Sequence, residues 1–152
     1  MSSTHLASAL VARFEHLRMT DVEAVGGKNA SLGEMISQLS ESGVRVPGGF
    51  ATTAHAFRTF LSAGGLASRI ARMQQEPGFA SDPKLRQKAL AQLRDEIVQW
   101  PVDAATAASW RAAWQSRLGG GGVFVRSSSN SEDLPGFSGA GLYTTVPNVK
   151  TG

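Results

Sequence analysis

Cysteine is absent from this 152-residue sequence, which excludes a disulfide framework and thiolate metal sites. No hydrophobic run approaches the length of a membrane span, and residues 1–20 lack the charged start and unbroken apolar core of a signal peptide. The net charge is only +3 and the basic residues form no block, which argues against nucleic-acid binding. We therefore expect a cytoplasmic protein that binds neither membranes nor nucleic acids.

The histidines indicate no site either. His5, His16 and His55 show no metal-ligand spacing among themselves or with nearby acids. Hydrophobic residues make up 41% of the chain and charged residues 18%, a balance typical of folded globular proteins. At this length we expect one domain, or a piece of one.

Apolar residues at helical spacing occupy most of the chain. Residues 26–43 predict an amphipathic helix that begins near Asn29 and ends before Gly43, because one stripe holds Leu32, Met35, Ile36 and Leu39. A strand, a bend and a second helix capped by Thr53 follow in residues 44–65. Residues 66–118 form a helical segment in which Asp82 and Pro83 mark one helix start.

The first candidate site is "GGKNASL", residues 26–32. Its glycines permit close backbone approach, a helix N-terminus offers unpaired N–H groups, and Lys28 adds a positive charge. These properties favour an anion such as phosphate. The stretch is not a Walker A loop, since Val22 stands at the position of the first glycine and Asn29 replaces the hydroxyl residue that would hold magnesium. A plain glycine turn followed by a solvated lysine remains the alternative.

The second candidate is Arg126, which follows a short apolar run that predicts a buried strand. A guanidinium in such a place needs an anionic partner, either a phosphate or an internal carboxylate from Glu132 or Asp133. The glycine-rich residues 136–141, "GFSGAG", have the backbone freedom of a loop that closes over phosphates. Two candidate phosphate sites in one small chain support each other.

Residues 21–61 and 123–149 together resemble the N-terminal nucleotide-binding domain of the family that contains phosphoenolpyruvate synthases (pyruvate, water dikinases) and pyruvate phosphate dikinases. The blocks "GGKNASL" and "VFVRSSSNSEDLPGFSGAGLY" occur in the family's order and spacing. The second block is also similar to the glucan water dikinases, and rifampicin phosphotransferase belongs to the wider group. The resemblance covers about 130 residues and implies an α+β fold, the N-terminal subdomain of an ATP-grasp domain.

The resemblance implies ATP as ligand and assigns roles at matching positions. Lys28 and Arg126 would contact the ATP phosphates beside Gly27 and Asn29, and the loop around Gly139 and Gly141 would fold over them. In such enzymes ATP phosphorylates a histidine on another domain, which passes the phosphoryl group to an acceptor such as pyruvate. Catalysis at the ATP end is mostly positioning and charge neutralisation by cations and Mg²⁺.

The family places further parts downstream of residue 152, including the magnesium-binding carboxylates, the phosphohistidine domain and the acceptor domain. The sequence therefore predicts one wall of an ATP site, inactive by itself, with no catalytic residue and no metal ligand assigned here. An exposed apolar surface that promotes self-association is expected where the missing half would pack. The alternative function is a non-catalytic nucleotide-binding or interaction module derived from the same domain.

Overall fold

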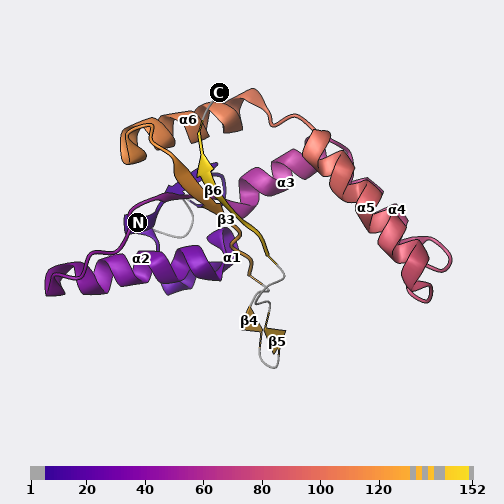
Figure 1. The fold of residues 1–152 in the computed structure, drawn as a ribbon, viewed down its shortest axis with the longest axis horizontal. Helices are drawn as coiled ribbons and strands as arrows, with labels where there is room; N and C mark the ends of the chain where they lie inside the picture. The colour runs from indigo at the N-terminus through magenta and orange to yellow at the C-terminus, as the bar shows by residue number, and fades with distance from the viewer. Residues whose placement is uncertain (1–5, 131–132, 135–136, 139–142, 151–152) are drawn as a thin grey trace. The chain divides into compact units, whose positions relative to one another are not determined.

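The computed structural model describes residues 6–130, 133–134, 137–138 and 143–150. It consists of helices and short two-stranded antiparallel sheets, which confirms the α+β prediction. The chain divides into two compact units, one formed by residues 1–56 and 105–152 and the other by residues 57–104. Figure 1 shows the order of the elements along the chain. None of the described helices combines the length and apolarity that a bilayer span requires.

The first unit begins with a strand pair that encloses a helical excursion. β1 (Val11–Arg13) pairs with β2 (Phe50–Thr52), with Ala12 opposite Ala51. The excursion contains η2 (Phe14–His16), η3 (Met19–Asp21), α1 (Val22–Val25), α2 (Gly27–Leu39) and η4 (Ser40–Ser42). Gly43 ends this run in the left-handed conformation, at φ +76°, which confirms its predicted role as a helix terminator.

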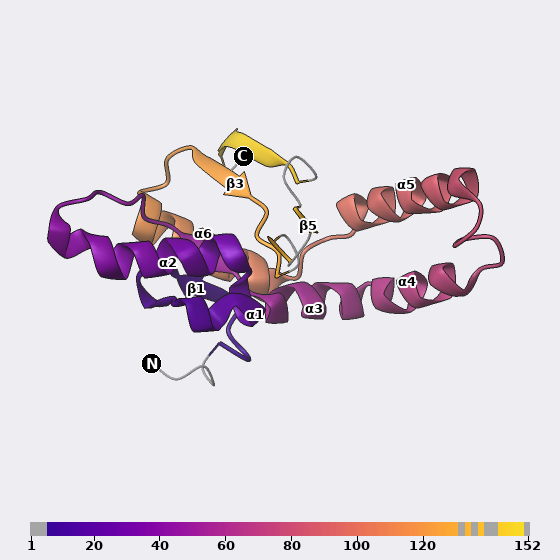
Figure 2. The same ribbon diagram turned by 90° about the horizontal axis from the view of Figure 1, so that it is seen from below.

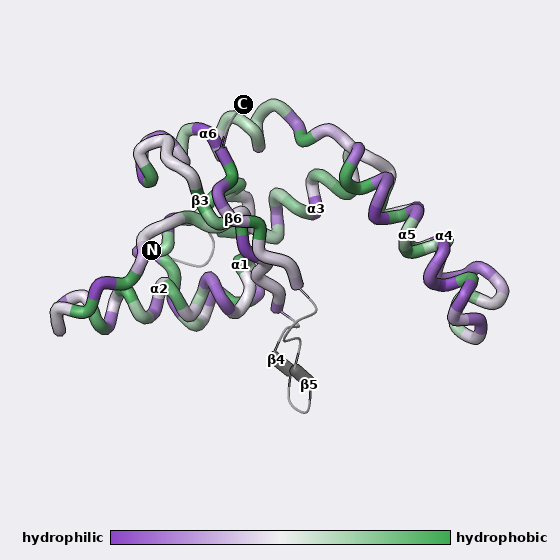
Figure 3. The backbone as a smooth tube through the Cα atoms, viewed as in Figure 1, coloured by the Kyte–Doolittle hydropathy of each residue, from purple (hydrophilic) through white to green (hydrophobic). Residues whose placement is uncertain are grey.

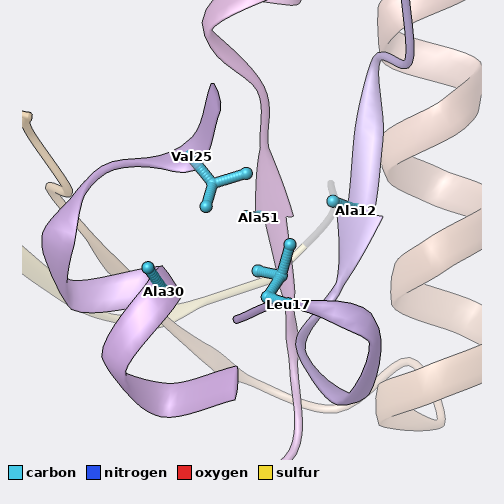
Figure 4. Packing of buried hydrophobic residues seen from close by; sticks show 5 residues of the cluster. All are labelled: Ala12, Leu17, Val25, Ala30 and Ala51. Atoms are coloured by element: carbon cyan, nitrogen blue, oxygen red, sulfur yellow. The ribbon is translucent and has the colours of Figure 1, made fainter. Parts of the chain in front are cut away.

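A small apolar core holds this unit together. Leu17 is fully buried, and four further buried residues surround it: Ala12, Val25, Ala30 and Ala51 (Figure 4). Gly33 of α2 lies against the same leucine, where an added Cβ would be 2.5 Å from Leu17 Cβ and 2.6 Å from its carbonyl oxygen. The helix therefore needs a glycine at this point to approach the core.

The apolar stripe of α2 is not its buried face. The helix starts at Gly27 rather than near Asn29, and its buried residues are Ala30 and Gly33. The apolar stripe that suggested the helix remains partly exposed, and Leu32 and Met35 from it line a pocket. Small residues form the buried face because the backbones of α2 and η2 approach closely there.

The remaining strands of the first unit form two separate two-stranded antiparallel sheets. β3 (Val123–Arg126) pairs with β6 (Thr145–Val149), and β4 (Asp133–Leu134) pairs with β5 (Phe137–Ser138). The expectation of a buried β3 is wrong, since Phe124 is 72% exposed and Val125 50% exposed. A two-stranded sheet has two open faces, and the described residues leave these side chains uncovered.

Helix α6 (Ala104–Leu118) adds side-chain anchors to the first unit. Trp110 Nε1 donates to Thr52 Oγ1 on β2, and Trp114 Nε1 donates to the carbonyl oxygen of Gly121 at 2.7 Å. Both tryptophans are half-buried, so they contribute to packing and also use their polar edges.

The second unit is helical, as predicted for most of its length. It contains the part of α3 (Ala54–Ala63) from Phe57 onward, followed by α4 (Leu66–Gln75) and α5 (Pro83–Gln99). The last two lie side by side (Figures 1 and 2) and bury Met73, Ala89 and Leu93. Asp82 caps α5 by accepting from two backbone N–H groups, which confirms that predicted helix start. Figure 3 shows mainly hydrophilic residues along this pair, interrupted by hydrophobic ones.

Candidate functional site

The two motifs that the sequence singles out meet in the first unit. The backbone N–H of Gly27 donates to the carbonyl oxygen of Ser129 at 3.0 Å, and the N–H of Asn29 donates to Ser128 Oγ at 3.2 Å. Ser128 Oγ in turn donates to the carbonyl oxygen of Val25 at 2.8 Å. The start of α2 and the residues that follow β3 are thus joined by hydrogen bonds across about a hundred residues of sequence.

A glycine makes this junction possible. Gly26 has φ +80° and ψ 163°, a region of backbone conformation that is accessible essentially to glycine alone. A Cβ added there would lie 2.5 Å from the carbonyl carbon and oxygen of Ser128. The first glycine of "GGKN" therefore allows close contact with the backbone of Ser128. The sequence had suggested that the glycines of this motif allow a ligand to approach closely.

A pocket of about 390 Å³ opens beside this junction. Its volume falls within the range of roughly 300–1,000 Å³ that is usual for small-molecule sites. Polar and charged residues line one part of it: Gly27, Lys28, Ser31, Arg126, Ser129 and Asn130. Apolar side chains line the rest: Met19, Val22, Leu32 and Met35. The pocket can accommodate a ligand with one anionic end and one apolar part.

Lys28 and Arg126 give the pocket its charge. No carboxylate belongs to the lining among the residues that the structure describes. Lys28 Nζ lies 5.8 Å from the centroid of the Tyr143 ring, within range of a cation–π interaction. These two side chains contribute positive charge to the lining, which favours anions.

Glu34 lies on the α2 surface near the apolar lining and fixes Met19. Its Oε2 accepts a hydrogen bond from the Met19 backbone N–H at 3.1 Å, and its Oε1 accepts from Gln38 Nε2 at 3.1 Å. These two hydrogen bonds, the backbone one foremost, hold the pKa of Glu34 below its ordinary value. Glu34 is therefore a carboxylate at neutral pH, and it orients one edge of the pocket.

The N-terminus of α2 is less open to a ligand than the sequence suggested. Its N–H groups at Gly27, Asn29 and Ala30 donate to Ser129 O, Ser128 Oγ and Gly26 O. The Asn29 side chain turns back and donates to the Val25 carbonyl oxygen at 2.8 Å. Because protein acceptors occupy these donors, the side chains of Lys28 and Arg126 remain the principal candidates for contact with an anion.

The predicted site residues divide into three groups. Gly27, Lys28 and Arg126 lie together in the pocket lining, whereas Asn29 lies at the junction behind it. Gly139 and Gly141 fall outside the described residues. The side chains of Glu132 and Asp133, the alternative anionic partners of Arg126, fall outside the described part of the structure.

Several residues of the site were not singled out from the sequence. Ser128 and Ser129 belong to a serine run of the kind that is common in solvated loops, so composition gave no reason to choose them. Leu32 and Met35 have the helical spacing of core residues, and Met19 has only the apolar character of one. The signal that could have separated them is the Ala30–Gly33 pair, which predicts close helix packing on the opposite face of α2.

Metal-binding side chains are not gathered in this part of the chain. The described residues contain no cluster of three or more His, Cys, Asp or Glu that could hold a metal ion. His55 lies in the first turn of α3 and is half-buried.

Comparisons with known proteins identify relatives of this chain. Residues 22–152 match the family described as "Pyruvate phosphate dikinase, AMP/ATP-binding domain". The chain is 49% identical over 156 residues to the phosphoenolpyruvate synthase of Neisseria meningitidis, and this match covers 95% of the chain and 19% of that protein. It is 41% identical to the phosphoenolpyruvate synthase of Escherichia coli, with 97% of the chain and 19% of that protein covered.

A third relative, the phosphoenolpyruvate synthase of Deinococcus radiodurans, is 45% identical over 93% of the chain and 18% of its own length. The chain thus spans about a fifth of the length of the curated relatives that it matches. The relatives match nearly the whole chain, and the family match covers residues 22–152. This chain belongs to the pyruvate phosphate dikinase AMP/ATP-binding domain family.

Proposed function

We propose that this chain binds ATP and forms the N-terminal wall of the ATP site in a phosphotransferase of the phosphoenolpyruvate synthase type. The observation that carries the proposal is the pocket in which Lys28 and Arg126, from two distant sequence blocks, line one positively charged end. Charged donors bind phosphate oxygens more strongly than neutral ones do, and the arginine fork can bind two oxygens at once.

The proposal gives the phosphate contacts to side chains. Lys28 and Arg126 bind the phosphate oxygens, while Gly27 and Asn29 hold the junction that places them. The loop around Gly139 and Gly141 covers the phosphates, as the family resemblance implies. The apolar residues of the pocket, such as Leu32 and Met35, exclude water from one side of the ligand.

Magnesium and the phosphoryl acceptor belong to the wider proposal. The described residues do not fit a magnesium site, since neither the pocket lining nor any other described cluster supplies a set of carboxylates. We therefore assign no magnesium ligand to this chain. Pyruvate as acceptor and a phosphohistidine as carrier are proposed for the whole enzyme by analogy with the relatives, which are named phosphoenolpyruvate synthases.

Titration of the ¹⁵N-labelled chain with MgATP, followed by amide chemical shifts, tests this function. We expect the largest shifts around Lys28 and Arg126. The substitutions Lys28→Ala and Arg126→Ala should each weaken binding about tenfold or more, because a hydrogen bond to a charged group contributes about 1.5–3 kcal/mol. Weak binding by an open half-site remains measurable in this assay.

Two substitutions outside the pocket serve as charge-matched controls. Lys150→Ala and Arg45→Ala each remove one positive charge from an exposed position that is not in the pocket lining. They should leave MgATP affinity within about twofold of the unsubstituted chain, since exposed charges outside a site act mainly through screened long-range fields. Equal effects of all four substitutions would show that binding follows net charge alone and would refute the site.

A further inference from the structure

The side chain of Ser128 joins the residues before α2 to its first turn, beside the pocket. Its single hydroxyl donates to the Val25 carbonyl oxygen at 2.8 Å and accepts from the Asn29 N–H at 3.2 Å. It thereby uses both its donor and an acceptor position. These two partners flank Lys28 along the chain, and Ser128 itself follows Arg126 by two residues. The hydroxyl is thus bonded to the backbone on both sides of one cation and is close in sequence to the other.

We propose that Ser128 is a positioning residue, which sets the spacing between Lys28 and Arg126 so that both can bind one polyphosphate. This inference rests on the proposed function. Lysine and arginine side chains have many rotamers, so two of them act together on one ligand only when their backbones are held at a suitable separation. The hydrogen bonds of Ser128 supply that constraint.

Two neighbouring contacts make the constraint local and stiff. Gly27 N–H donates to the Ser129 carbonyl oxygen at 3.0 Å, and Gly26 lies so close to the Ser128 backbone that no Cβ fits between them. Both contacts use the backbone of the serine run, whereas the contacts of Ser128 Oγ use a side chain. Replacement of that side chain therefore removes two hydrogen bonds and leaves the backbone contacts in place.

The neighbouring serine provides a matched control. Ser127 is half-buried like Ser128, yet the structure shows no hydrogen bond of its side chain to any described residue, and it is not in the pocket lining. Ser127→Ala and Ser128→Ala make the same chemical change one residue apart. Ser128→Thr keeps the hydroxyl.

The test measures MgATP affinity by amide shifts for these three variants of the 152-residue chain. We expect Ser128→Ala to weaken binding about fivefold, as loss of a typical hydrogen bond does, and Ser127→Ala and Ser128→Thr to stay within about twofold. The Asn29 amide should also exchange with deuterium faster in Ser128→Ala, because its acceptor is gone. An unchanged affinity in Ser128→Ala would overturn the inference.

A double-mutant cycle separates positioning from a general structural role. Lys28→Ala and Arg126→Ala are combined in the unsubstituted chain and again in the Ser128→Ala background. We expect the two cations to be coupled in the former and closer to additive in the latter. A coupling that Ser128→Ala leaves unchanged would refute positioning even if affinity fell.

The same data distinguish the two proposals. If Lys28→Ala and Arg126→Ala do not weaken MgATP binding, the proposed function fails and the inference fails with it. If both weaken it while Ser128→Ala does not, the function stands and only the positioning role of Ser128 is wrong.

Discussion

Replacement of Gly26 by alanine is the sharpest test of the junction between the two motifs. Gly26 adopts φ +80° and ψ 163°, a conformation that costs a residue with a Cβ about 1–3 kcal/mol. The new Cβ would also lie 2.5 Å from the carbonyl carbon and oxygen of Ser128, which are backbone atoms that cannot rotate away. The shifts in the backbone that would make room for the Cβ typically destabilise a protein by about 1–3 kcal/mol more. We expect Gly26→Ala to lower the free energy of unfolding by about 4 kcal/mol, the middle of the summed range.

Gly43 is the matched control for this substitution. It also has a positive φ, +76°, but a Cβ added there would meet nothing within 4 Å. Gly43→Ala should therefore cost only the left-handed backbone term, about 1–2 kcal/mol. The difference in unfolding free energy between the two variants reports two effects at Gly26: its contact with Ser128 and its less accessible backbone conformation.

The assay is urea unfolding of both variants, followed by far-UV circular dichroism and by tryptophan fluorescence. Trp110 and Trp114 belong to the same compact unit as Gly26, so their fluorescence reports the relevant transition. Equal losses of stability in Gly26→Ala and Gly43→Ala would refute the reasoning, because they would mean that the serine run does not approach Gly26 as described.

Two further predictions concern single side chains of the first unit. Thr53 is 1% exposed, and its Oγ1 accepts from the Ala56 N–H at 3.1 Å and donates to the Ala9 carbonyl oxygen. Thr53→Ala should therefore lower the free energy of unfolding by about 1–2 kcal/mol. Thr53→Ser keeps the hydroxyl and should lower it clearly less, as measured by urea unfolding. The pKa of Glu34 is lowered on folding, mainly by the Met19 N–H, so its contribution to stability is present above the ordinary value of 4.5 and is lost as pH falls through the folded pKa. Carboxyl NMR titration checks this directly, and a Glu34 pKa at or above the ordinary value would contradict the assigned hydrogen bonds.

Local signals in the sequence predicted the helices well. Asp82 and Pro83 marked the start of α5, and Thr53 capped α3, because a cap depends on groups only a few residues apart. The start of α2 was predicted two residues late, since Gly26 and Gly27 look like a turn until the serine run supplies acceptors for the N–H groups of the helix. Helix ends that depend on nearby residues could thus be predicted from the sequence, whereas a helix start that depends on distant partners could not.

Burial was the least predictable property. The apolar stripe that contains Leu32 and Met35 predicted helix α2, yet the helix buries Ala30 and Gly33. Hydrophobicity measures how much a side chain gains from burial, whereas close approach between backbones selects small residues. β3 was expected to be buried for the same reason, and Phe124 and Val125 are exposed.

The sequence by itself determined the α+β class, the helical segment of residues 66–118 and the two blocks that identify the family. It also singled out Lys28 and Arg126, because the charge of a residue and the glycines near it can be seen in the sequence alone. Only the tertiary structure decided that these cations line one pocket, and that the serine run satisfies the start of α2. Hydrogen bonds across about a hundred residues depend on how the chain folds back, and no local pattern records such a pairing.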